Sequence, residues 1–357
     1  MSEYSLTFSA QTVFRWSLIL PFQITGVSGH VGFRVLVEAL TRGYRVRAIV
    51  RREEQKNQII NTASVQPFAK NLTFVVIEDL SKNGAFDGIL EGVEGIVHVA
   101  SPLPFDSNDY KTDMIDPVIK MTVEVLEAAS RAKTVRRVVI TSSGGILLSW
   151  EYMVSNDVSK VFNANDVCEP PPPTSHFDLP VQAYAASKSH AFAATQRFIK
   201  ERKPHFDVIN ILPTMVIGKN ELNRSKEEVT KGTNNTFLAS LLGVRSAMPQ
   251  PGASVHVNDV ARAHIDALNP SIAGNQNLLC SSGGLEGTTW DDSKDIMKRL
   301  YSKELLEKYF TLDGVTPTRP VRVDYSETER LLGWKFGGFE EQIKSVVDHY
   351  IGLASTE

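Results

Sequence analysis

The chain has little cysteine and lacks any long apolar run. Its 357 residues include two cysteines, Cys168 and Cys280, and neither has Cys or His neighbours at the spacing of metal ligands. This argues against a disulfide framework and a metal site, and it favours a reducing, cytoplasmic compartment. No stretch reaches the roughly 18 apolar residues of a membrane span, so no membrane partner is predicted.

The sequence also lacks an excess of charge of one sign. It carries 38 Lys and Arg against 41 Asp and Glu, a formal net charge of -3. Nucleic acids and anionic membranes select for a basic field, which is missing here, so we expect a small-molecule partner and no nucleic acid. The length and the 42% hydrophobic content suit a globular chain with a substantial core.

Short apolar, β-branched runs alternate with segments of helical period as far as Pro213. This alternation predicts βαβ units, and therefore an α/β protein with a Rossmann-type, doubly wound parallel sheet. The expected strands are residues 18–25, 45–50, 72–77, 95–100, 137–141 and 207–212, and the expected helices include 31–41, 118–131 and 184–200. Residues 144–180 are predicted to be a long loop, and such loops are often functional.

A glycine motif stands where the first strand should meet the first helix. It reads Thr25-Gly26-Val27-Ser28-Gly29-His30-Val31-Gly32. Glycines at this spacing permit a tight turn, a close approach of the backbone to a pyrophosphate, and close packing of helix on sheet. An ordinary glycine-rich turn is the alternative, but the flanking strand and helix favour a dinucleotide site.

Two arginines end the second expected strand. An acidic residue at this place would bind the ribose 2′-hydroxyl of NAD, whereas an arginine would pair with the 2′-phosphate of NADP. Arg51 and Arg52 stand there, followed by Glu53 and Glu54. We therefore predict NADP(H), although a solvated charge cluster would look the same.

Tyr184 and Lys188 form the one Tyr-x-x-x-Lys pair among nine tyrosines. A spacing of four places both side chains on one helix face. Reduction of a carbonyl needs a proton on the developing alkoxide, and a nearby ammonium would lower the pKa of the phenol that supplies it. Ser142 or Ser143, at the end of the fifth expected strand, could polarise the carbonyl or could simply cap the strand.

Taken together, these motifs resemble an extended short-chain dehydrogenase/reductase of the dihydroflavonol reductase-like group, which includes fungal ketone, aldehyde and methylglyoxal reductases. The resemblance runs from about Ile24 to Tyr350. It implies that Ser143, Tyr184 and Lys188 are catalytic. It also implies a cofactor site formed by Thr25, Gly26, Ser28, Gly29, His30, Val31, Gly32, Arg51, Asp79, Leu80, Ala100, Ser101, Tyr184, Lys188 and Pro213.

The sequence departs from the group in a few places. Pro21 would lie inside the first, central strand, where proline cannot donate to the ladder. Phe192 occupies a position that often holds glutamate, and Asn258 one that often holds aspartate. These departures leave the implied catalytic residues intact.

The expected organisation is an N-terminal lead at 1–17, an NADP-binding Rossmann domain at 18–213 to which 255–266 returns, and a smaller, mostly helical substrate-binding region at 214–357. The expected activity is NADPH-dependent reduction of a small, apolar or aromatic ketone or aldehyde, with Tyr184 as proton donor, in a monomer or homodimer. Relatives of this kind often serve fungal secondary metabolism. The alternatives are a nucleotide-sugar epimerase or dehydratase, a 3β-hydroxysteroid dehydrogenase-like enzyme, and a dinucleotide-sensing regulator of the NmrA kind.

Overall fold

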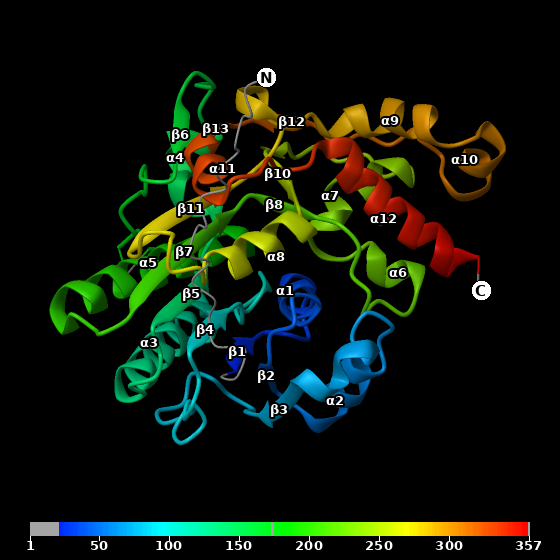
Figure 1. Cartoon of the computed structure of the whole chain (residues 1–357). Coiled ribbons are helices and arrows are strands. Elements are labelled where there is room, and N and C mark those ends of the chain that lie inside the picture. Colours follow the sequence, from blue (N-terminus) through cyan, green and yellow to red (C-terminus); the bar gives the residue numbers. More distant parts are fainter. Residues whose placement is uncertain (1–20, 173–174, 356–357) are drawn as a thin grey trace, which may run out of the picture.

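The computed structural model describes residues 21–172 and 175–355 (Figure 1). The expected N-terminal lead and the predicted strand residues 18–20 lie outside this part. Strand β1 is Phe22–Thr25, so Pro21 precedes the strand instead of lying inside it. The backbone N–H of Glu94 donates to the Pro21 carbonyl at 3.2 Å. The expectation of a proline within the central strand was therefore wrong, and the strand ladder loses no donor.

A seven-stranded, wholly parallel sheet forms the centre of the molecule, in the order β11-β7-β5-β4-β1-β2-β3. The six predicted strands are confirmed, and β11 is a seventh that the sequence pattern did not reveal. With β1, the strands are β2 (Val46–Val50), β3 (Leu72–Val76), β4 (Gly95–His98), β5 (Arg137–Thr141), β7 (Asp207–Pro213) and β11 (Gln276–Cys280). This is the doubly wound Rossmann-type sheet that was predicted.

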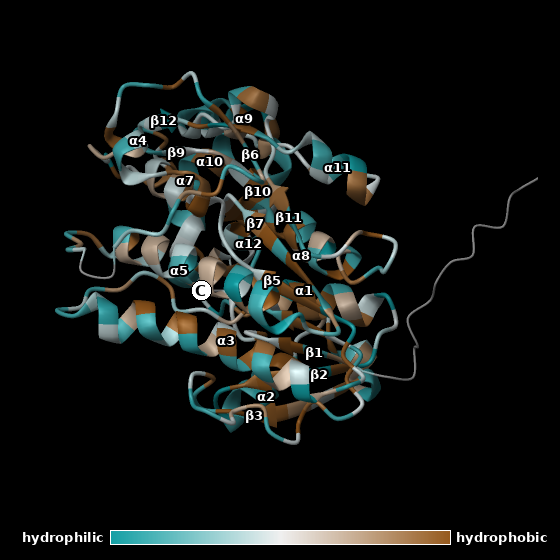
Figure 2. Cartoon of the chain, turned by 90° about the vertical axis from the view of Figure 1, so that its left-hand side faces the viewer, coloured by the Kyte–Doolittle hydropathy of each residue, from teal (hydrophilic) through white to brown (hydrophobic). Residues whose placement is uncertain are grey.

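Helices cover both faces of this sheet. Helices α1 (His30–Thr41) and α8 (Val257–Asp266) pack against each other, and so do α3 (Asp116–Arg131) and α5 (Pro180–Arg202). Each face of the sheet has its own apolar core, and successive residues of β4 point into different ones. Val97 packs with the residues of α1, while Ile96 packs with the residues of α3. Figure 2 shows the apolar strands enclosed between these layers.

The remaining elements lie mostly at the carboxyl ends of the strands. Three pairs of short strands are parallel: β6 (Val161–Asn163) with β13 (Arg322–Asp324), β8 (Met215–Ile217) with β10 (Ser254–His256), and β9 (Gln250–Gly252) with β12 (Thr318–Pro320). The other helices are α2 (Glu53–Ile60), α4 (Trp150–Val154), α6 (Lys226–Val229), α7 (Asn235–Leu241), α9 (Ser293–Leu300), α10 (Lys303–Tyr309), α11 (Ser326–Leu332) and α12 (Phe339–Ala354).

Two local predictions need correction. The segment 144–180 is not wholly a loop, because it contains α4 and β6, and β6 is held by distant β13. Helix α5 begins at Pro180 rather than at Tyr184, since proline suits the first turn of a helix. Tyr184 and Lys188 therefore lie inside the helix, where their backbone is fixed.

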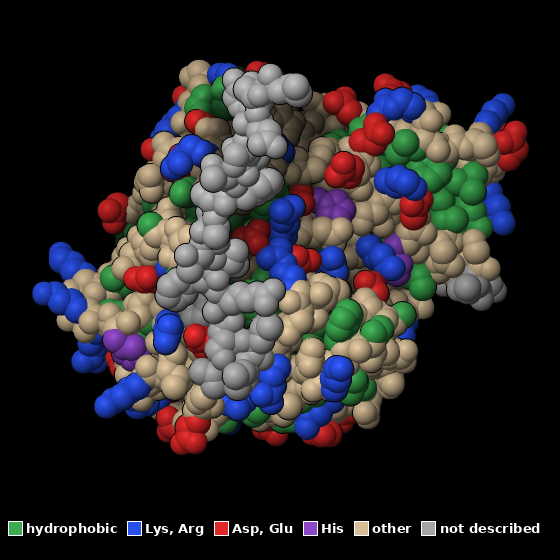
Figure 3. Space-filling view, viewed as in Figure 1, with side chains coloured by type: hydrophobic (Ala, Val, Ile, Leu, Met, Phe, Trp, Pro, Cys, Tyr) green, Lys and Arg blue, Asp and Glu red, His purple; other side chains and the backbone are tan. Residues whose placement is uncertain are grey.

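The surface carries both signs of charge. On the face shown in Figure 3, basic and acidic side chains are interspersed. None of the helices in the described ranges has the length and hydropathy needed to cross a bilayer.

Candidate active site

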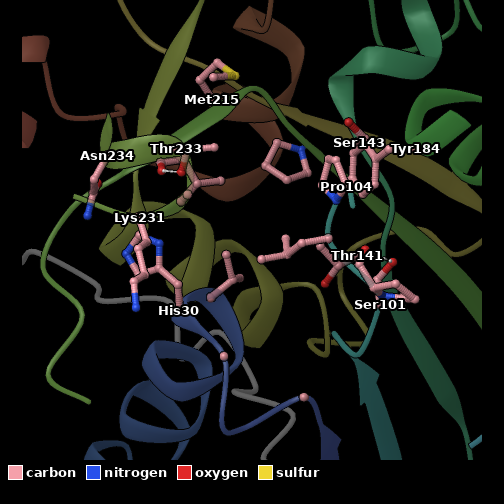
Figure 4. Close-up of a pocket in the computed structure, with 18 of the residues that line it drawn as sticks. His30, Ser101, Pro104, Thr141, Ser143, Tyr184, Met215, Lys231, Thr233 and Asn234 are labelled. Carbon is pink, nitrogen blue, oxygen red and sulfur yellow. Dashed lines mark hydrogen bonds between the residues drawn. The ribbon is translucent and has the colours of Figure 1, made fainter. Parts of the chain in front are cut away.

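A cavity of about 2120 Å³ opens at the carboxyl ends of the parallel strands. Its walls come from the loops that follow β1, β2, β3, β4, β5 and β7, together with the start of α5 and segments between residues 220 and 323. Ligands of open α/β sheets bind at this edge. The close-up in Figure 4 shows Ser101, Thr141, Ser143 and Tyr184 on one side, and His30, Lys231, Thr233 and Asn234 on the other.

The glycine turn fits a dinucleotide because no side chain could occupy its inner positions. Gly26 has φ +75°, and a Cβ on it would lie 2.7 Å from the Ala100 backbone nitrogen. A Cβ on Gly32 would lie 2.1 Å from the Gly26 carbonyl oxygen. Ser28, Gly29, His30 and Val31 line the cavity at the N-terminus of α1, where free amides and the helix dipole favour a pyrophosphate.

Two of the predicted cofactor residues do not line the cavity. The Thr25 hydroxyl oxygen accepts hydrogen bonds from the backbone N–H groups of Val99 and Ala100 at 3.1 and 3.2 Å, and it ties β1 to the loop after β4. The Asp79 carboxylate accepts from the Ser81 backbone and hydroxyl at 2.9 and 2.6 Å, which lowers the pKa of Asp79. Both residues shape loops, while Leu80, Ala100, Ser101 and Pro213 face the cavity.

Arg51 and Arg52 are exposed at the cavity wall. Their backbone N–H groups donate to the Gln55 side-chain oxygen at 2.9 and 3.2 Å, which fixes the turn between β2 and α2. The fixed turn places both arginines at the end of β2, the position expected for a group that binds a 2′-phosphate.

The structure brings Ser143, Tyr184 and Lys188 close together on one wall of the cavity. The Lys188 ammonium donates to the Thr141 carbonyl at 3.0 Å and lies 5.8 Å from the centre of the Tyr184 ring. The Ser143 hydroxyl oxygen accepts from the Gly145 backbone N–H at 3.0 Å, so its own proton remains available for a ligand. Figure 4 shows Ser143 next to Tyr184.

Burial controls the protonation of this pair. It raises the pKa of the Tyr184 phenol to about 12 and lowers the pKa of the Lys188 ammonium to about 8. In the chain on its own, desolvation of the phenolate determines the Tyr184 pKa, and the lowering expected from Lys188 together with a bound oxidised nicotinamide stays a prediction. The phenol is fully protonated at neutral pH, which suits a proton donor.

The wall opposite Tyr184 was missed by the sequence reasoning. Lys231 is exposed there, and Thr233 donates to the Val216 carbonyl. The Asn234 side chain bonds both backbone groups of Gly218, at 3.0 and 2.9 Å. This segment was assigned only to a substrate region, since it has neither helical nor strand periodicity, and the run Gly232-Thr233-Asn234-Asn235 is its one local signal of a turn.

The two further departures have structural partners. Phe192 packs with the cluster of Ile146 and Leu147, and the Asn258 side chain accepts from Arg34 at 2.6 Å, joining α8 to α1. Neither lines the large cavity. Across 21–172 and 175–355, no group of three or more His, Cys, Asp or Glu residues could hold a metal ion.

The sheet and its glycine turn define a Rossmann-type α/β protein. The chain belongs to the NAD dependent epimerase/dehydratase family, whose profile matches residues 22–277, and the family resemblance seen in the sequence is thereby confirmed. It is 34% identical to the ketoreductase CTB6 of Cercospora nicotianae over 347 residues, which cover 94% of this chain and 96% of that one. It is also 34% identical to the NAD-dependent epimerase/dehydratase ALT6 of Alternaria alternata, over 90% of this chain and 95% of that one.

A solved structure of similar fold is the yeast methylglyoxal/isovaleraldehyde reductase Gre2 complexed with NADPH. It matches with a TM-score of 0.80 and 24% identity, over 95% of this chain and all of that one. At this identity the likeness supports the fold alone.

Proposed function

We propose that the protein is an NADPH-dependent ketoreductase that acts on a small, uncharged, apolar or aromatic ketone or aldehyde. The observation that carries the proposal is the grouping of Ser143, Tyr184 and Lys188 on one wall of the cavity that the glycine turn opens. The relative named a ketoreductase, similar over nearly its whole length, supports the same activity.

The residues at the glycine end of the cavity suit NADP(H). The α1 amides would face the pyrophosphate, and Arg51 would pair with the 2′-phosphate through its planar guanidinium. The cofactor would supply the hydride for the reduction. A fungal reductase of the same fold is described in complex with NADPH.

The chain's own residues would bind the carbonyl and supply the proton. Ser143 donates a hydrogen bond to the substrate carbonyl oxygen, and the Tyr184 hydroxyl transfers its proton to the same oxygen as negative charge develops there. Lys188, held by the Thr141 carbonyl, provides the positive charge that stabilises the phenolate left on Tyr184.

The part of the cavity lining that follows Asn235 in the chain favours an uncharged substrate. Every lining residue beyond Asn235 in the chain is uncharged, and most are apolar. The apolar members are Ala239, Val244, Pro251, Ala253, Val315, Val321 and Val323. A nucleotide-sugar substrate would need cationic partners for its diphosphate, and among the described lining residues Lys231 is the one cation after Lys188, so the lining favours a reductase over an epimerase. The relatives of fungal origin are consistent with a role in secondary metabolism.

The test is NADPH oxidation, followed by absorbance, with the wild type beside Tyr184→Phe. The panel contains aldehydes, aliphatic ketones and aromatic ketones, and NADH serves as the cofactor control. We expect turnover of apolar ketones with NADPH, reduced at least about 100-fold by the substitution, because general acid catalysis contributes on this scale. Dinucleotide binding without turnover of any carbonyl would overturn the proposal, and nucleotide sugars would then be tested.

A further inference from the structure

Next to Lys188 lies a second, much smaller cavity of about 10 Å³, which is room for about one water molecule. Lys188 lines both cavities. The small one is also lined by polar side chains from four elements: His98 of β4, Thr122 of α3, Thr195 of α5 and Asn210 of β7, with Ser142 following β5. A buried space with several polar partners is the kind of place that holds an ordered water.

Two polar atoms around this cavity have no hydrogen-bond partner among the described residues. They are the Nε2 atom of His98 and the hydroxyl oxygen of Ser142. His98 is 2% exposed and Ser142 is 7% exposed. A buried polar group without a partner is costly, so both atoms are expected to bind something small.

The hydrogen bonds of Thr25 determine which nitrogen of His98 carries the proton. Thr25 Oγ1 accepts from the backbone N–H groups of Val99 and Ala100 and lies 3.0 Å from His98 Nδ1. With both lone pairs occupied, the hydroxyl uses its proton to donate to Nδ1. In the neutral imidazole the proton is then on Nε2, which is the atom without a partner.

Burial and the Lys188 charge keep His98 neutral by lowering its pKa to about 3. His98 Nε2–H and the Lys188 ammonium are therefore both donors, and two donors cannot bond each other directly. A shared acceptor between them satisfies both groups.

We propose that a buried water molecule held by His98 and Ser142 accepts a hydrogen bond from Lys188, which makes His98 a positioning residue for the active-site lysine. The water accepts from His98 Nε2–H and from the ammonium, and it donates to the Ser142 oxygen. The water can donate its second proton to a hydroxyl or amide oxygen of the remaining polar residues that line the same cavity. All of its hydrogen-bonding capacity can then be used.

The consequence for the reaction rests on the proposed function. Lys188 acts as a cation, and besides the Thr141 carbonyl the water gives its ammonium a second acceptor. The titratable groups around Lys188 are Tyr184 on the same helix, His98, and His264 of α8, which reaches it through Thr141. Burial lowers the pKa of His264 to about 4, so this histidine is neutral as well. Loss of the water would remove one acceptor of the Lys188 ammonium and so lower the pKa of Lys188 further.

The structural part of the test does not depend on turnover. In a crystal structure of the full chain we expect a water within hydrogen-bond distance of His98 Nε2 and Lys188 Nζ. Nitrogen-15 spectra of the histidines should show His98 protonated on Nε2 from pH 6 to pH 8. Protonation on Nδ1, or a His98 ring in direct contact with Lys188, would overturn the proposal even if the protein reduces ketones.

The kinetic part uses His98→Leu, with His98→Gln as the matched control, since the glutamine amide can restore a donor near Nε2. We expect His98→Leu to lower kcat about tenfold at pH 7, to leave the KM for NADPH within about threefold, and to move the alkaline limb of the kcat profile down by about one pH unit. His98→Gln should recover most of the loss. An unchanged alkaline limb in His98→Leu would overturn the proposal.

Ser142→Ala tests the same water if the His98→Leu variant fails to fold. It removes the acceptor proposed for the water, and it should shift the alkaline limb in the same direction by a smaller amount, with an unchanged melting temperature. No shift in a folded Ser142→Ala would count against the water. If the wild type reduces no carbonyl at all, the proposed function fails, while the crystal and histidine spectra still decide whether the water is there.

Discussion

At the scale of single residues, the burial of Lys188 links activity to stability. Lys188 is 5% exposed, and burial lowers the pKa of its ammonium from 10.5 to about 8. Between these pH values the unfolded chain keeps a proton that the folded chain has released, so the free energy of unfolding rises with pH in this window. Below pH 8 both states carry the charge, and the cost of burying it stands in full.

We therefore expect Lys188→Met to abolish turnover and yet to raise the free energy of unfolding at pH 7 by about 2 kcal/mol, after the lost hydrogen bond to Thr141 is allowed for. Urea unfolding at pH 7 and pH 10.5 measures this, and the gain should shrink at the higher pH. Exposed Lys133, changed to Met, is the control and should show little gain at either pH. An equal gain at both pH values would contradict the prediction.

The choice between dinucleotides also belongs to a single side chain. Arg51→Ala should weaken NADPH binding about 10- to 100-fold and NADH binding by no more than about threefold, because only NADPH carries the 2′-phosphate that a guanidinium can pair with. Fluorescence titration of both cofactors gives the two dissociation constants. Arg202→Ala is the control, since Arg202 pairs with Glu127 on the surface and does not line the cavity. An equal loss of affinity for both dinucleotides would show that Arg51 does not pair with the 2′-phosphate.

At the scale of an element, helix α1 depends on a glycine contact. A Cβ at position 32 would meet the Gly26 carbonyl at 2.1 Å, whereas a Cβ at Gly352, inside α12, would meet nothing within 4 Å. We expect Gly32→Ala to lower the free energy of unfolding by more than about 2 kcal/mol and to weaken NADPH binding. Gly352→Ala should raise it by up to about 1 kcal/mol, since alanine favours a helix. Urea unfolding compares the two, and a Gly32→Ala protein as stable as the wild type would contradict this reading of the turn.

The elements that the sequence predicted well are those with local patterns. Six strands of the main sheet and its long helices carry apolar periodicity that can be counted within a short window. Strand β11 lacks β-branched residues and exists because β7 offers it a parallel edge. Strand β6 likewise depends on pairing with β13, more than 150 residues further along the chain. Such pairings are decided by tertiary contacts, which no local pattern records.

The site shows the same division. The glycine turn and Tyr184 with Lys188 were predictable, because their chemistry requires fixed spacing within one turn or helix. The wall opposite Tyr184, at Lys231 and Asn234, could not be predicted, because it is an irregular segment whose position depends on hydrogen bonds between Asn234 and Gly218. The motif also could not show that Thr25 and Asp79 face loop backbone instead of the cavity, because that depends on which neighbours their oxygens find.

At the scale of the whole molecule, one core includes residues from both sides of Pro213, where the sequence suggested a boundary with 255–266 returning to the first domain. Val257 and Val260 of α8 and Leu278 of β11 pack in the same cluster as Val35 and Leu36 of α1. The sheet also needs β11 to cover the edge of β7. The first 213 residues therefore bury their apolar faces only when residues 255–280 return to them.

We accordingly expect a fragment of residues 1–213 to remain unfolded, although it contains the glycine turn, Tyr184 and Lys188. Near-ultraviolet circular dichroism and amide proton dispersion would measure this, with the full chain as the control that folds. The physical reason is that the fragment exposes one apolar face of α1 and a bare parallel strand, both of which favour aggregation. A fragment with native-like dispersion that binds NADPH would show instead that the dinucleotide half is an independent domain, and that α8 and β11 only cover it.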